Sequence, residues 1–189
     1  MGALLLWYGG LNELSGRAAS SAAESTIRAF ARPASTLVEW KSIRAVTFRR
    51  SDFGSRSEVP GFDPAGITAN LALFLALWAA TPGTATAKAF RGGVACLVAL
   101  FASHVLHVVL TVEATWATML GSWSIYHYPR WLREIFATGR YFFDIVLKYA
   151  LPFALWGAFL LVPAIREREE RAEERDRTPS LGRKRKKKR

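Results

Sequence analysis

Cysteine, histidine and acidic residues are all scarce in this sequence. Its 189 residues include one Cys and three His, and its 26 Lys and Arg outnumber 15 Asp and Glu, for a net charge of +11. The single cysteine, Cys96, excludes an intrachain disulfide and any metal site built only from cysteines. It lies in an apolar run, so we expect a small buried side chain there.

The positive charge does not by itself indicate a nucleic-acid partner. About half of the surplus lies in the C-terminal tail, and basic residues beside a membrane segment are expected from membrane topology alone. We therefore predict no nucleic-acid partner.

Charge is missing altogether from long parts of the chain. Three apolar stretches are Ala65–Thr81, Gly92–Val112 and Ile145–Ile165. The second has no Asp, Glu, Lys or Arg, and the third has only Lys148, near one end. A helix that crosses a membrane needs about 20 apolar residues. The sequence predicts an all-α integral membrane protein with three clear transmembrane helices, in a membrane domain over residues 65–165.

The N-terminal residues 1–16 allow two interpretations. Met1–Tyr8 is apolar but too short for a signal peptide or a spanning helix. It is either an interfacial foot or the end of a partial N-terminal span, with the aromatic pair Trp7 and Tyr8 at the membrane interface.

The C-terminal tail, residues 166–189, sets the predicted orientation. Arg183–Arg189 is a run of seven basic residues, and positive charge close to a span is retained in the cytoplasm. We expect a multi-pass protein of the cytoplasmic (inner) membrane with a cytoplasmic C-terminus. Arg166–Arg177 mixes both charge signs and predicts a solvated helical extension. The polybasic end is a topology anchor or a site for anionic lipids.

Residues 17–64 fall outside the membrane in this orientation. Leu11–Ala31 predicts a helix that Pro33 ends, and Thr36–Arg50 predicts one or two short strands. Ser51–Pro64 is rich in turn residues and predicts a loop. We expect a small external α/β segment with little core of its own, resting on the membrane or on a partner.

Residues 129–143 predict an amphipathic helix in the outer membrane interface. Pro129 suits a first helical turn, and aromatic residues alternate with arginines at helical spacing. The predicted membrane-interface residues are Trp123, Tyr126, Tyr128, Arg130, Trp131 and Arg133, with Trp116 extending the same aromatic belt. Pro152 predicts a kink in the last span.

Few residues offer chemistry. His104 and His107 lie three apart in the second span, and intramembrane ionisable residues are functional candidates. They are either metal or haem ligands, with His127, Glu113 or Asp144 as a third ligand, or neutral rings that hydrogen-bond to a neighbouring helix. Asn70 is a polar intramembrane residue expected to hydrogen-bond across helices. We predict no catalytic residue and no cofactor.

Three short motifs carry a family resemblance. They are Thr68–Gly83 (TANLALFLALWAATPG), His104–Val109 (HVLHVV) and Leu151–Trp156 (LPFALW). Together they resemble the small membrane proteins associated with exosortase systems, especially the exosortase H-associated type, over residues 66–162. The resemblance implies a bacterial inner-membrane accessory near a machinery that processes sorted surface proteins. The chain departs from the pattern by lacking a complete first span, and no catalytic residue is carried over.

Three functions follow as hypotheses. The first is a non-enzymatic accessory or scaffold subunit of a bacterial cytoplasmic-membrane complex, linked by the resemblance to exosortase-type surface protein sorting. The second is an intramembrane His-based metal or haem-binding protein. The third is a small-molecule or lipid transport component that uses the Pro152 kink. The expected partners are membrane lipids and either a membrane protein or a second copy of the chain.

Overall fold

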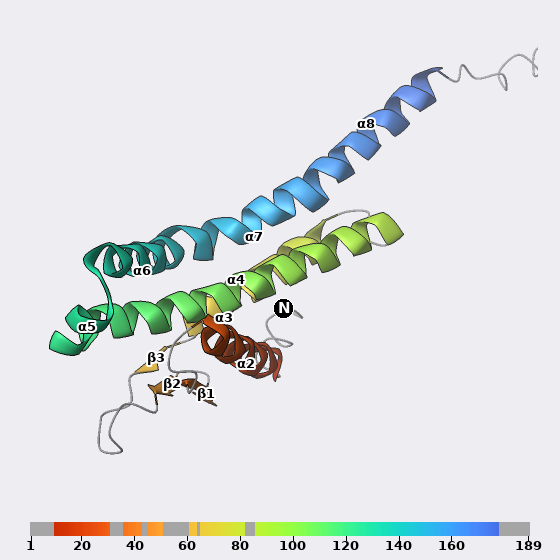
Figure 1. Ribbon diagram of the computed structural model, residues 1–189. Coiled ribbons are helices and arrows are strands. Elements are labelled where there is room, and N and C mark those ends of the chain that lie inside the picture. The colour runs from red at the N-terminus through yellow and green to blue at the C-terminus, as the bar shows by residue number, and fades with distance from the viewer. Residues whose placement is uncertain are drawn as a thin grey trace, which may run out of the picture.

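The computed structural model describes residues 10–30, 36–42, 45–50, 61–63, 65–81 and 86–177. The predicted foot at Met1–Tyr8 and the polybasic end Arg183–Arg189 lie outside these ranges. The described chain is mostly helical, with one small sheet (Figure 1). Its elements are α2 (Asn12–Phe30), β1 (Thr36–Ser42), β2 (Ala45–Arg50), β3 (Gly61–Phe62), α3 (Ala65–Ala80), α4 (Ala87–Met119), α5 (Ser122–His127), α6 (Arg130–Phe142), η2 (Phe143–Leu147), α7 (Lys148–Trp156), η3 (Gly157–Leu161) and α8 (Val162–Arg177).

Two helical stretches in the described chain are long and apolar enough to cross a membrane. One is α4, and the other is the unbroken helix Arg130–Glu174, which α6, η2, α7, η3 and α8 build together. The predicted span at Ala65–Thr81 forms an apolar helix, α3, but its 16 residues fall short of the length of the other two. The all-helical membrane fold is thus supported by two candidate spans, not by three.

The central helix α4 is longer than its apolar run predicts. Thr86 caps its N-terminus by accepting a hydrogen bond from the backbone N–H of Ala89 at 3.2 Å. The helix then runs for 33 residues, about 50 Å at 1.5 Å per residue, against a hydrocarbon thickness of roughly 30 Å. It continues past the predicted end at Val112 as far as Met119. Part of α4 therefore has to be covered by protein or water.

A cap, formed by α2 and the three-stranded antiparallel sheet, covers the C-terminal half of α4. Its strand order is β1-β2-β3, and alternate residues of β2 point inward. Phe48 lies edge-on to the ring of Trp116 at a centroid distance of 5.8 Å, and both side chains are almost fully buried. The shared core contains Ala23, Ile27, Val38, Val46, Phe48, Val108, Val112, Trp116, Ala117 and Tyr128.

This core bears on two expectations. The external segment was expected to have little core of its own, and its buried residues do form one continuous apolar cluster with α4. Trp116 was expected in the membrane-interface belt, yet it is fully buried beneath the cap. The expected helix and strands are confirmed as α2, β1 and β2, whereas β3 forms where a loop was predicted.

The long helix Arg130–Glu174 packs on the opposite side of α4 from the cap (Figure 1). A second apolar cluster joins it to α3 and to the N-terminal half of α4. Its buried members are Phe74, Cys96, Leu100 and Leu160, so the expected burial of Cys96 is confirmed. The indole N–H of Trp156 donates to the Thr81 hydroxyl at 2.7 Å and fixes the end of α3.

The long helix is unbroken where the sequence suggested an interfacial helix followed by a separate span. Pro129 sits just before its first turn as the N-cap, and its last element, α8, ends at Arg177, where the tail extension was predicted to end. Pro152 lies inside α7, between the two π segments η2 and η3. Proline and π turns are common causes of helix bending. This helix therefore has three adjacent sites, η2, Pro152 and η3, at which its backbone hydrogen bonding is irregular.

The contact between α3 and α4 depends on a glycine. A Cβ atom placed on Gly93 would collide with the indole ring of Trp78, whereas one placed on Gly157 would meet nothing within 4 Å. We expect Gly93→Ala to destabilise the protein by about 1–3 kcal/mol, because an overpacked contact must shift. The measurement is the midpoint of detergent-induced unfolding. Gly157→Ala is the matched control and should leave the midpoint unchanged or slightly higher; equal effects of the two variants would contradict the packing described.

Candidate functional site

His104 is joined to the neighbouring helix α3. Its side chain is 2% exposed, and its Nε2 lies 2.6 Å from the Oδ1 of Asn70, which is also buried. Because an amide oxygen only accepts, the ring donates through Nε2 and is held in one tautomer. The interpretation of Asn70 as a residue that bonds across helices is consistent with this contact.

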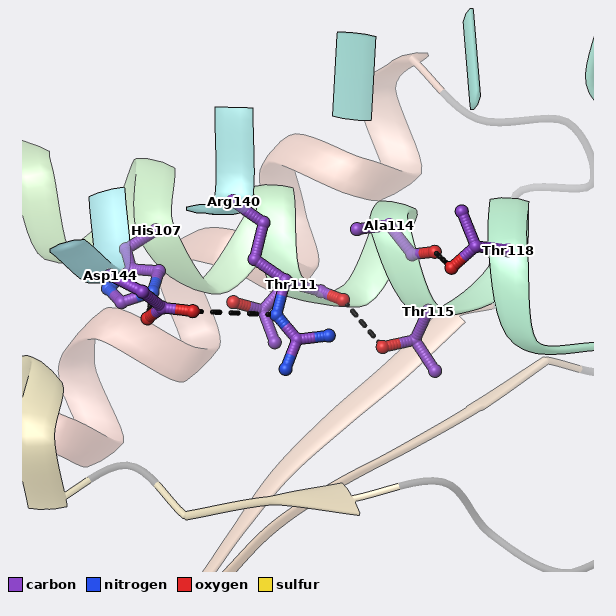
Figure 2. Close-up of polar contacts among 7 residues, drawn as sticks. All are labelled: His107, Thr111, Ala114, Thr115, Thr118, Arg140 and Asp144. Atoms are coloured by element: carbon purple, nitrogen blue, oxygen red, sulfur yellow. Dashed lines mark hydrogen bonds and ion pairs between the residues drawn. The ribbon is translucent and has the colours of Figure 1, made fainter. Parts of the chain in front are cut away.

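His107 faces a different neighbour. Its Nε2 lies 2.9 Å from the Oδ1 of Asp144 in η2, and its ring stacks on Phe143 at a centroid distance of 5.2 Å. Figure 2 shows Asp144 between His107 and Arg140, whose Nε lies 3.6 Å from the second carboxylate oxygen. The two histidines therefore do not converge on one ligand. Each holds α4 to a different helix.

A polar cavity of about 220 Å³ adjoins His107 and Asp144. Its wall is completed by Phe62, Asp63, Thr111, Arg140 and Lys148. Thr111 is 3% exposed, and its hydroxyl has no hydrogen-bond partner in the described structure, although its carbonyl accepts from Thr115 at 2.8 Å (Figure 2). A buried hydroxyl needs a partner, so this cavity suits water or a small polar group. Together, His107 and Asp144 can hold a proton between them.

A second polar cluster lies beneath the cap. Arg50 is 4% exposed, and its guanidinium carbon lies 5.0 Å from the ring centroids of both Trp116 and Trp123. Alternation along β2 explains this burial, since Arg50 follows Val46 and Phe48 on the inward face. Two aromatic faces stabilise a desolvated guanidinium through cation–π attraction. Arg50 is thereby fixed as part of the core.

Tyr128 and Glu113 complete this cluster. The Tyr128 hydroxyl donates to Glu113 Oε2 at 2.8 Å. Burial, followed by the nearby negative charge of Glu113 and their hydrogen bond, raises the pKa of Tyr128 above its ordinary value. A cavity of about 350 Å³ opens beside the two residues, walled mainly by apolar side chains of α2, α4 and α6. It has the size and lining of a small amphipathic ligand site.

The structure separates the proposed third ligands of the histidine pair. Asp144 reaches His107, but Glu113 bonds to Tyr128, and the His127 ring stacks on Trp123 at 4.1 Å. Among the described residues, no three His, Cys, Asp or Glu side chains lie close enough together to hold a metal ion. Metal or haem binding at His104 and His107 stays a prediction.

The predicted membrane-interface residues divide into two groups. Tyr126, Arg130 and Trp131 are exposed, as that role requires. Arg133 and Trp123 are half-buried, and Tyr128 is 8% exposed within the cap core. Sequence reasoning missed Arg50, although it follows Val46 and Phe48 at the two-residue period of a strand. It also missed the grouping of Arg140, Asp144 and Lys148, whose four-residue spacing places them on one helix face.

The bond between His104 and Asn70 can be measured by a double-mutant cycle. We expect a coupling energy of about 0.6–1.7 kcal/mol between His104→Ala and Asn70→Ala in the free energy of unfolding in detergent. His127→Ala is the control, because this exposed ring stacks on Trp123 and the structure records no contact between it and Asn70. It should show no coupling to Asn70→Ala. Additive effects at His104 and Asn70 would mean that the hydrogen bond does not hold the helices together.

The raised pKa of Tyr128 predicts an alkaline loss of stability. Below the ordinary tyrosine pKa of about 10, the phenol is neutral in both the folded and unfolded states, and the stabilisation is present in full. Above that pH the unfolded state ionises first, so stability falls as pH rises towards the folded-state pKa. We expect a shallower fall between pH 9 and 11.5 in Tyr128→Phe, measured as the unfolding temperature. Parallel curves for the two proteins would contradict the shift.

The chain was compared with protein-family models, curated proteins and solved structures. No protein-family model, curated protein or solved structure matches the chain.

Proposed function

We propose that this protein is a non-enzymatic accessory or scaffold subunit of a bacterial cytoplasmic-membrane complex. One observation carries the proposal: an uncovered apolar stripe runs along the helix Arg130–Glu174. Only 11% of the residues in the most apolar part of this helix are buried. Its opposite face packs on α4, so the stripe is the side available to another molecule.

The stripe consists of large side chains that recur at helical spacing. Its members are Trp131, Ile135, Phe142, Ile145, Tyr149 and Phe153, each at least 50% exposed. Lipid alone can cover such a surface, but a helix of a partner subunit can cover it as well. The cap is fixed to the other side of α4 and leaves the stripe open to such a partner.

The proposed membrane arrangement has three spans and a cytoplasmic C-terminus. It is supported by the two long apolar helices and by the change from apolar to charged residues after Ile165. The shorter α3 covers about 24 Å, less than the roughly 30 Å of hydrocarbon, so the bilayer has to thin around it or a partner has to shield its end. The cap then lies on the outer face.

The link to surface protein sorting rests on the motifs at 68–83, 104–109 and 151–156. In that setting the protein is an accessory of an exosortase-type machinery. The paired contacts of His104 with Asn70 and His107 with Asp144 suit this role, since both hold helices together.

Co-purification tests the proposal. The tagged full-length chain is extracted from its own cells in mild detergent, and the proteins that accompany it are identified and quantified. We expect a stoichiometric membrane partner in the preparation. Ile145→Ala combined with Phe153→Ala should lower its recovery by about thirtyfold, because apolar anchors at helix contacts contribute on the order of 1 kcal/mol each.

The matched control removes two apolar side chains from another exposed surface. Phe90 and Val98 of α4 are 59% and 63% exposed and lie outside the stripe. Phe90→Ala combined with Val98→Ala should leave partner recovery unchanged. A pure homo-oligomer with no other stoichiometric protein would overturn the accessory role.

A further inference from the structure

A basic cavity lies at the end of the protein opposite the cap. It has a volume of about 260 Å³ and opens between the N-terminus of α4, η3 and the first turns of α8. Lys88 comes from α4, and Arg168 and Arg171 come from α8. Segments some 80 residues apart in sequence therefore bring three cations to one opening.

The charge of this cavity is positive overall. Among the described residues that line it, Glu167 alone is acidic, and it pairs with Lys88 at 3.3 Å. The Lys88 side chain is 76% exposed, so this pair is weak and the lysine can turn towards another anion. Arg168 and Arg171 present the planar guanidinium groups that bind phosphate oxygens in pairs.

The N-terminus of α4 adds to the same potential. Thr86 and Ala89 line the cavity, and the Thr86 hydroxyl satisfies the N–H of Ala89. The preceding N–H groups of the first turn have no partner within the helix. The positive end of the dipole of a 33-residue helix therefore faces the space into which the three cations reach.

The wall of the cavity formed by η3 and the start of α8 is apolar. Phe159, Leu160, Pro163 and Ala164 line it, and the first charged residue of this helix after Lys148 is Arg166. Arg168 and Arg171 lie one to two turns beyond the apolar limit. An anionic phospholipid has the same order of groups: a phosphate at the membrane surface and acyl chains in the membrane interior. The cations of the cavity would contact the phosphate, and the apolar wall would contact the chains.

We infer that this cavity binds the phosphate headgroup of an anionic phospholipid in the adjacent leaflet. The inference needs the helices to be in a membrane, but it does not depend on the partner proposed above. A run of basic residues such as Arg183–Arg189 is expected to attract the same lipids through charge alone. A specific site must therefore be distinguished from that general attraction by the residues that line it.

Native mass spectrometry of the full-length chain in neutral detergent tests the inference, with phosphatidylglycerol as the probe. The wild-type protein should retain one phosphatidylglycerol molecule in preference to phosphatidylcholine. Lys88→Gln combined with Arg168→Gln should lower the affinity by about thirtyfold, because each basic residue near an anionic surface contributes roughly fivefold in binding. Glycerol 3-phosphate serves as the soluble form of the headgroup.

The matched control is Arg91→Gln combined with Arg166→Gln. These residues belong to the same two elements at the same end of the molecule, but they do not line the cavity. The control should bind phosphatidylglycerol as the wild type does, with the polybasic run intact in both variants. Equal losses in the two double variants, or no loss in either, would overturn the inference in favour of general attraction. Binding of glycerol 3-phosphate as tight as that of the lipid would also overturn it, in favour of a soluble phosphate compound.

Glu167→Gln gives a second test with the opposite sign. Removing the one acidic side chain of the cavity frees Lys88 and raises the local positive charge. We expect phosphatidylglycerol to bind several-fold more tightly, as it should when one opposing charge is lost. Weaker binding would contradict the site even if the double variant at Lys88 and Arg168 failed to fold.

Discussion

The length of α4 is the constraint on which the rest of this structure depends. A 33-residue helix with an apolar sequence exceeds the thickness of a bilayer, so its C-terminal half needs another cover. The cap supplies that cover through Trp116, Phe48 and their neighbours. Burying one large apolar side chain stabilises a fold by about 1.5–3 kcal/mol, so this cluster is sufficient to hold a cap that is too small to form a core alone. The cap and α4 thus share one apolar core.

Polar side chains add specificity to this apolar framework. Asn70 and Asp144 bind neighbouring histidines from two sides of α4, and Arg50 enters the cap core between two indole rings. Each contact satisfies a group that would be costly to bury alone. Since every one of them joins different elements, they fix the rotation of the helices about their own axes, which apolar packing leaves loosely defined.

The sequence predicted the positions of most helices and strands, but not which of them pack against one another. Apolar runs, Pro33 and the mixed charges after Arg166 located α2, α3, α4 and the end of α8, because helix formation and termination are local. The burial of Trp116 could not be predicted, since an apolar run looks the same whether lipid or protein covers it. Arg50, Glu113 and Tyr128 meet from three distant segments, and nothing local to any one of them signals the other two. Two signals were overlooked: the four-residue spacing of Arg140, Asp144 and Lys148, and the alternation of Arg50 with Val46 and Phe48.

The long helix Arg130–Glu174 joins the cap side of the protein to its charged far end without a loop. A straight helix would act as a rigid rod and carry a tilt at α6 directly to the basic cavity at α8. This one has η2, Pro152 and η3 within 19 residues, from Phe143 to Leu161. Helices bend first where their backbone hydrogen bonding is irregular. Bending is therefore expected first in this segment, which lies between α6 and the basic cavity at α8.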